Sequence, residues 1–101
     1  MATTSKTLFR GAATTTVGTT LYTVPASTTT VVTNIVITNT AASAGTFTLG
    51  LGGTNFATTV TVGANDSTMI DLKQVLTATQ TITGGASATT INFHISGVEI
   101  A

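Results

Sequence analysis

The stretch LYTVPASTTTVVTNIVITNT, residues 21–40, places valine, isoleucine and threonine in close succession and contains no charged side chain. β-Branched residues fit the pleated surface of a strand better than they fit a helix. Pro25 has no amide hydrogen for a strand ladder, so it is expected to end one strand before the long run from Thr30 to Thr40. The stretch predicts an all-β protein, and it raises the question of how so much uncharged chain stays in solution.

The composition of the whole chain extends this pattern. Hydrophobic residues make up 42% of the 101 residues, whereas charged residues make up only 6%, against roughly 25% in an ordinary soluble domain. Threonine, which occurs 28 times, fills the gap. Because the formal net charge is zero, no long-range field attracts nucleic acid or membrane, and little self-repulsion keeps copies apart. We therefore expect a homo-oligomer with no nucleic-acid or membrane partner.

The length suits a single domain, residues 1–101. Glycine-rich clusters at 52–55, 63–66 and 84–87 tolerate positive φ and predict turns. Eight strands are expected between such turns, at residues 6–13, 19–24, 30–40, 46–51, 56–62, 68–72, 79–83 and 89–100. This spacing is typical of an antiparallel β-sandwich of about eight strands, with either a jelly-roll or an immunoglobulin-like strand order.

Side-chain alternation assigns residues of the third strand to faces. Val31, Ile35 and Ile37 are expected on one face, and Val32 and Val36 on the other. Apolar residues on both faces predict a central strand, or a strand whose outer face a neighbouring subunit covers.

A helical spacing follows the sixth expected strand. Leu72, Val75 and Leu76 lie three and four residues apart, as on one side of a helix. A short helical turn that closes one end of the sandwich is therefore expected at residues 71–76.

The ionisable residues are too few and too scattered to predict catalysis. General acid and base chemistry needs two groups around one pocket, and an enzyme would require Asp71, His94 and Glu99 to converge. His94 is the only histidine and there are no cysteines, so one chain lacks the ligands for a metal site. We expect no enzyme activity, no metal and no cofactor.

The amino terminus carries two of the three positive charges. Lys6 and Arg10 flank Leu8 and Phe9, a pattern that predicts a docking arm over residues 1–10, with Phe9 lying on a partner and Arg10 binding a carboxylate there. The alternative is an ordinary first strand with solvated ends. The candidate interface residues are Lys6, Leu8, Phe9, Arg10, Val98 and Ile100.

Four segments together resemble small all-β virion proteins of tailed bacteriophages. They are the run from TLFRGAATTTVG through YTVP to NIVITNTAAS, then GTFTLGLGG, NDSTMIDLKQVL and the closing INFHISGVEIA. The resemblance implies a β-sandwich, often trimeric, that attaches to a capsid, neck, tail or baseplate and has no catalytic residues to carry over.

A capsid decoration, or cement, protein is the first expectation, because the chain is one small module without a fibrous extension. Its partners would be itself, with a trimer favoured, and the phage major capsid protein or other virion proteins. Its location would be the virion, after synthesis in the host cytoplasm. The alternative is a neck, tail, baseplate or fibre component with an adhesion role toward a receptor or sugar.

Two further alternatives concern binding surfaces. A sugar-binding module predicts a pocket around Tyr22 or at residues 41–45. An ice-binding surface predicts a flat face of ranked threonines, but the Thr-x-Thr triplets that begin at Thr46, Thr59, Thr79 and Thr81 share no period.

Overall fold

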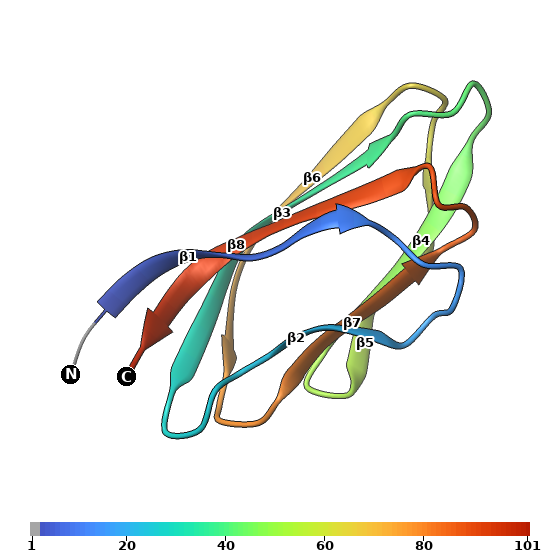
Figure 1. Ribbon diagram of the computed structural model, residues 1–101. Helices are drawn as coiled ribbons and strands as arrows, with labels where there is room; N and C mark the ends of the chain where they lie inside the picture. The colour runs from blue at the N-terminus through green and yellow to red at the C-terminus, as the bar shows by residue number, and fades with distance from the viewer. Residues whose placement is uncertain (1–2) are drawn as a thin grey trace.

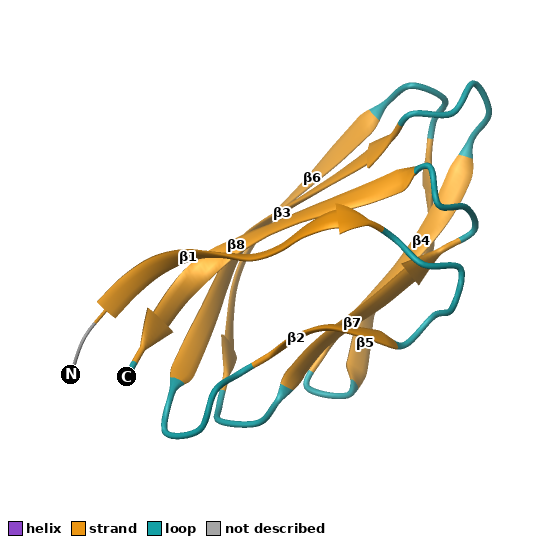
Figure 2. Ribbon diagram, in the orientation of Figure 1, coloured by secondary structure: helices purple, strands orange, loops and turns teal. Residues whose placement is uncertain are grey.

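The computed structural model describes residues 3–101, which form eight strands and no helix. The strands are β1 (Thr3–Ala12), β2 (Thr19–Thr23), β3 (Thr29–Asn39), β4 (Gly45–Leu51), β5 (Thr54–Val62), β6 (Ser67–Leu76), β7 (Thr81–Ala86) and β8 (Ile91–Ile100). Figure 2 shows that loops connect the strands throughout. The eight expected strands are confirmed, with boundaries displaced by a few residues.

The strands form two four-stranded antiparallel sheets that pack as a sandwich (Figure 1). The first sheet has the order β1-β8-β3-β6 and the second the order β2-β7-β4-β5. β1 therefore pairs with β8, β2 with β7, β3 with β6 and β4 with β5. This is the pairing of one long hairpin that turns back between β4 and β5 and is then folded into two sheets. This is the jelly-roll order, which decides between the two sandwiches that the sequence left open.

Two of the three expected glycine turns are confirmed. Gly52 and Gly53 have φ values of 59° and 86° and connect β4 to β5. Asn65, with a φ of 53°, lies in the turn between β5 and β6. Pro25 follows the end of β2 by two residues, as its missing amide hydrogen predicted.

The turn expected at residues 84–87 is wrong, because Gly84 and Gly85 lie inside β7. Within β7 the two glycines do not form a turn; they allow neighbouring segments to approach the strand closely. A Cβ at Gly85 would lie 2.4 Å from the carbonyl oxygen of Thr16, since the β1–β2 loop rests directly on the strand. A Cβ at Gly84 would lie 2.6 Å from the Leu49 side chain.

The expected helical turn at residues 71–76 is also wrong, because β6 continues as a strand to Leu76. Val75 pairs with Val31, and Leu76 with the buried Thr30. Val75 faces solvent, whereas Leu72 and Leu76 lie against the core. Leu72, Val75 and Leu76 therefore lie on both faces of a strand, although their spacing along the sequence also fits one side of a helix.

A row of β-bulges crosses the first sheet beside Ser96. One extra residue, Leu8, enters β1 opposite β8. Another, Thr33, enters β3, and β6 has an additional residue opposite the same point of β3. An extra residue leaves the ladder locally unpaired and increases the bend and twist of a strand.

The bulge at Thr33 corrects the faces expected for the third strand. An extra residue reverses the alternation, so Val32 shares the inner face with Ile35 and Ile37, all three fully buried. Val31 and Val36 lie on the outer face instead. Apolar residues do lie on both faces of β3, as expected, but the bulge changes which of them lie on which face.

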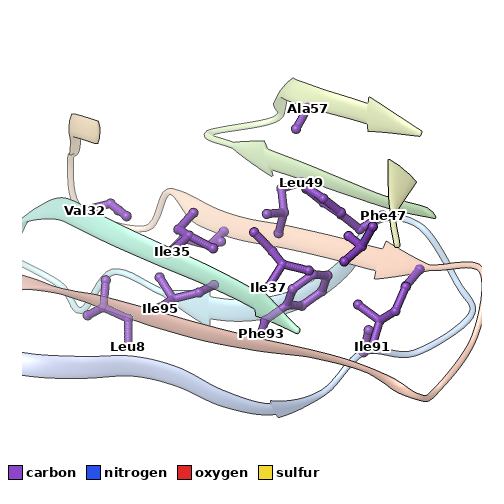
Figure 3. Close-up of a cluster of buried hydrophobic side chains, with 14 of the residues drawn as sticks. Leu8, Val32, Ile35, Ile37, Phe47, Leu49, Ala57, Ile91, Phe93 and Ile95 are labelled. Carbon is purple, nitrogen blue, oxygen red and sulfur yellow. The ribbon is translucent and has the colours of Figure 1, made fainter. Parts of the chain in front are cut away.

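The core fills the space between the sheets (Figure 3). Phe47 of the second sheet meets Phe93 of the first edge to face, with ring centroids 6.3 Å apart and planes at 75°, a favoured aromatic geometry. The other fully buried large side chains come from both sheets: Val24, Val32, Ile35, Ile37, Leu49, Val62, Ile82, Ile91 and Ile95.

Asn39 organises the end of the sandwich where β3 meets the β5–β6 turn. Its side chain is buried, and its amide nitrogen lies 2.9 Å from the Ser43 carbonyl oxygen and 3.3 Å from those of Val62 and Gly63. Its Oδ1 accepts the Ala41 amide hydrogen at 3.0 Å. One buried amide therefore holds the β3–β4 loop and the end of β5 together.

Gly97→Ala is expected to destabilise the protein by about 1–3 kcal/mol, the usual cost of overpacking. A Cβ at Gly97 would lie 2.4 Å from the Val31 carbonyl oxygen and 2.8 Å from Leu8, beside the bulge row. Gly11→Ala is the control, because its Cβ would meet only the Phe9 ring at 3.6 Å. Urea unfolding of both variants measures the difference, and equal stabilities would contradict the close packing at the bulges.

Candidate functional site

The outer face of the first sheet is the most extensive surface that the strand register defines. The register places these residues in five rows running from β1 through β8 and β3 to β6: Thr3, Ile100, Thr29; Ser5, Val98, Val31, Val75; Thr7, Ser96, Asn34, Asp71; Arg10, His94, Val36, Met69; and Ala12, Asn92, Thr38, Ser67. We call this set the outer face.

The outer face has one largely apolar row and a second row that is apolar over β3 and β6, and it has few charges. Val98, Val31 and Val75 lie side by side across three strands, and Val36 lies beside Met69 in another row. Met69 is 70% exposed and Val75 is 60% exposed. Apolar patches of this kind on a soluble protein mark contact surfaces.

Two open depressions flank Thr33 at the bulge row. One, of about 400 Å³, is lined mainly by Ser5, Thr7, Ser96 and neighbouring residues of β1 and β8. The other, of about 540 Å³, is lined by Thr33, Asp71, Leu72 and Lys73. The first is lined mainly by hydroxyls, and the second contains one carboxylate and one ammonium group, so neither brings together two carboxylates or a histidine for acid and base chemistry.

Two further exposed apolar side chains lie on β5, the edge strand of the second sheet. Asn39, beside β6 in the first sheet, bonds to the end of β5 and so connects this side of the sandwich. Phe56 and Val60 of β5 are 42% and 37% exposed. Met69 and Val75, by contrast, belong to the outer face of the first sheet.

A polar cluster joins the two sheets near the chain ends. Tyr22 of β2 donates its hydroxyl hydrogen to Glu99 of β8. The Thr30 hydroxyl lies 2.9 Å from the Tyr22 oxygen and must be the donor, because the tyrosine proton is already engaged. Lys6 Nζ lies 3.3 Å from both Glu99 carboxylate oxygens. These four residues, the polar cluster, bridge β1, β2, β3 and β8.

The cluster shifts the ionisation of its two acidic groups in opposite directions. The hydrogen bond from Tyr22, with a smaller contribution from Lys6, lowers the pKa of Glu99. Burial and the Glu99 carboxylate raise the pKa of Tyr22. Both shifts favour a charged glutamate beside a neutral tyrosine, the state in which the cluster fastens the sheets together.

The structure divides the candidate interface residues among different environments. Leu8 is buried, Phe9 packs half-buried against the core, and Lys6 is bound to Glu99. Arg10, Val98 and Ile100 lie on the outer face.

The expected docking arm is largely a strand. Residues 3–10 belong to β1 and pair with β8, while residues 1–2 of the expected arm lie outside the described residues. Because β1 is an intact strand and Leu8 is buried, the side chains of β1 that remain available to a partner are those that face outward, such as Arg10.

The residues that an enzyme would need are not brought together. His94 and Asp71 lie on the outer face, on strands separated by β3, whereas Glu99 belongs to the polar cluster between the sheets. Asp71 accepts a hydrogen bond from Asn34 Nδ2 at 3.1 Å. Within residues 3–101, no three His, Cys, Asp or Glu side chains gather in a group suited to a metal ion.

The Tyr22 region and the threonine-rich face differ from what the sugar-binding and ice-binding alternatives predict. The Tyr22 ring packs against the core and its hydroxyl belongs to the polar cluster, so it does not form a sugar platform. Threonines do line the outer side of the second sheet, but Gly50 and Gly85 interrupt their rows and the β1–β2 loop covers Gly85. In the part of the chain that the structure describes, no helix is long and apolar enough to span a membrane.

Comparison with known proteins gives no family for the chain. No protein-family model matches it, and no curated protein matches it. The candidate site is therefore defined by its geometry alone: a jelly-roll sandwich with a partly apolar outer face and a polar cluster near the chain ends.

Tyr22→Phe is expected to lower the free energy of unfolding by about 1–3 kcal/mol near pH 7, because it removes a hydrogen bond to a charged group. Since the folded pKa of Glu99 lies below its ordinary value of 4.5, its contribution is present above pH 4.5 and is lost as the pH falls through the folded pKa. The variant should therefore lose less stability than wild type on acidification. Urea unfolding between pH 2 and 7 tests this, and parallel pH profiles would contradict it.

Proposed function

We propose that this protein is a structural component of a bacteriophage virion, a capsid decoration protein that binds the outside of the shell as an oligomer and stabilises it. The observation that carries the proposal is the outer face, a nearly uncharged sheet surface with exposed Met69 and Val75. A surface of this size suits a protein partner. The sequence resemblance to small virion proteins supplies the setting.

We propose that the shell contacts the last row of the outer face, formed by Thr3, Ile100 and Thr29 near the ends of the chain. Thr3 pairs with Ile100, and Ile100 with Thr29, so three strands present their ends together. Figure 1 shows this end at one extreme of the elongated sandwich, whose principal extents are 46 × 21 × 18 Å. Because the polar cluster fastens β1, β2, β3 and β8 nearby, this end would bind without first becoming ordered.

Stabilisation of the shell would follow from mass action. A protein that binds only the expanded shell favours it by RT ln(1 + [L]/Kd), about 2.7 kcal/mol per site at a hundredfold excess over Kd. Repeated over many equivalent sites, this contribution resists disassembly and internal pressure. Such a role needs no catalytic residue and agrees with the dispersed positions of Asp71, His94 and Glu99.

Co-sedimentation with empty expanded heads of the encoding phage tests the proposal. Wild-type protein is expected to pellet with the heads at a fixed stoichiometry, and heads carrying it should withstand higher temperature. Absence of any binding to expanded heads would overturn the decoration role. Binding only to purified necks, tails or baseplates would favour the alternative virion location.

Ile100→Asp is expected to weaken head binding by about tenfold or more, because it places a charge at an apolar contact. The control is Val17→Asp, an equally charged change at an exposed valine in the β1–β2 loop, away from the chain ends. Circular dichroism verifies that both variants fold. Equal binding by the two variants would exclude the chain-end surface as the docking site.

A further inference from the structure

We propose that the outer side of the second sheet holds a binding site for one neutral sugar residue. The site is a hollow of about 210 Å³ between the β1–β2 loop and the bulged part of β5. The side chains that line it and carry the argument are those of Thr15, Val17, Thr46, Thr48, Thr59 and Ser87. We call this set the hydroxyl hollow. It belongs to the second sheet, so a partner bound to the outer face of the first sheet would leave it open.

The floor of the hollow is formed by Gly85 and Thr48, which pair across β7 and β4. Thr48 alternates with Phe47 and Leu49, which are buried in the core, so its side chain points out of the sandwich. Because Gly85 has no side chain, the β1–β2 loop lies directly on it, with the Thr16 carbonyl oxygen 2.4 Å from where a Cβ would be. The missing side chain brings the loop close enough to form a wall.

Hydrogen bonds fix this loop, which carries two of the lining side chains. The Thr16 carbonyl oxygen lies 3.1 Å from Thr14 Oγ1 and 2.8 Å from Thr19 Oγ1, and these two hydroxyl oxygens are 2.6 Å apart. Figure 1 shows the loop beside β7, where the Ala86 amide donates to the Thr14 carbonyl oxygen at 2.9 Å. The wall is therefore ordered before a ligand arrives, and binding need not order it.

The opposite wall contains a strained residue. Four non-glycine residues of the described chain have a positive φ, and Thr59, at 50°, is the one that lies within a strand. This backbone conformation is unfavourable for a β-branched residue. The Thr59 amide hydrogen bonds to Thr48 Oγ1 at 3.0 Å, which holds the strained residue against the floor. Strain of this kind persists only where the surroundings enforce it, and it concentrates at ligand sites.

The hollow presents hydroxyl groups and no charge. Thr48 Oγ1 accepts the Thr59 amide hydrogen, and its own hydrogen is left to donate. Ser87 Oγ accepts the Thr46 amide hydrogen at 3.0 Å and is left with the same capacity. None of the lining residues is charged, so an anion would meet no cation and a metal ion no carboxylate. A neutral ligand with several hydroxyls matches these groups.

Size restricts the ligand to one ring. The hollow of about 210 Å³ has the liquid volume of about seven water molecules, below the roughly 300–1,000 Å³ of drug-sized pockets. Val17, which is 56% exposed, lines it and offers methyl groups to the C–H face of a pyranose ring. A single hexose residue combines that apolar face with a rim of hydroxyls. The hollow lies apart from Tyr22 and residues 41–45, where the sequence predicted a sugar pocket.

Titration of the isotope-labelled full chain with glucose, galactose and mannose, followed by NMR, tests the site. At least one hexose is expected to shift the amides of residues 15–17, 48, 59 and 87 in a saturable way, with a dissociation constant of about 1–10 mM. Glucuronic acid should bind about tenfold more weakly, because its carboxylate would meet no cation. The absence of saturable shifts with all three hexoses, shifts confined to other residues, or equal binding of glucuronic acid would overturn the proposal.

Thr59→Gly distinguishes a ligand site from a purely structural bulge. Glycine adopts positive φ without strain but lacks the side chain, so the variant should melt at a higher temperature while its dissociation constant for the hexose rises about fivefold or more. The matched control is Thr79→Gly, which removes a threonine of similar φ, 69°, from the turn between β6 and β7. Unchanged hexose affinity in Thr59→Gly, or an equal loss in Thr79→Gly, would contradict the site.

A free hexose and the end of a polysaccharide chain share this chemistry. The methyl glycosides of the hexose that binds distinguish them, because their methyl group stands where a chain would continue. Retained binding assigns the hollow to a chain end, and lost binding assigns it to the free sugar. Failure of the protein to bind phage heads would leave these results unaltered and would overturn only the proposed function.

Discussion

The bulge row across the first sheet determines which side chains the protein buries and which it presents. An extra residue in β3 places Val32 on the inner face with Ile35 and Ile37 and turns Val31 outward. Without it, strict alternation would place Val31 with Ile35 and Ile37. The core and the outer face are thus two results of one local insertion, and Gly97 permits it because Val31 and Leu8 lie where its side chain would be.

Much of the fold follows from local chemistry in the sequence. β-Branched residues, Pro25 and the Gly52–Gly53 turn were sufficient to predict eight strands, because each acts through its own backbone preferences. The wrong predictions concern residues whose secondary structure depends on contact with distant segments of the chain. Gly84 and Gly85 lie in a strand because Leu49 and the β1–β2 loop approach them, and Val75 is strand rather than helix because Val31 pairs with it.

The candidate surfaces were predictable only in part. The sequence singled out Arg10, Val98 and Ile100, which lie on the outer face. It did not predict the polar cluster, because Tyr22 and Glu99 are 77 residues apart in the chain. It also could not show that Leu8 is buried, because the bulge that turns Leu8 inward appears only when β1 is paired with β8.

The opening problem of an uncharged, β-rich chain in water has a two-part physical answer. Threonine hydroxyls bind water on the strand faces without charge, while β6 carries Asp71, Lys73 and a bulge that discourage further strand pairing along its edge. These features oppose open-ended strand pairing, so the apolar surface that stays exposed is confined to side chains such as Met69 and Val75 on the outer face and Phe56 on β5.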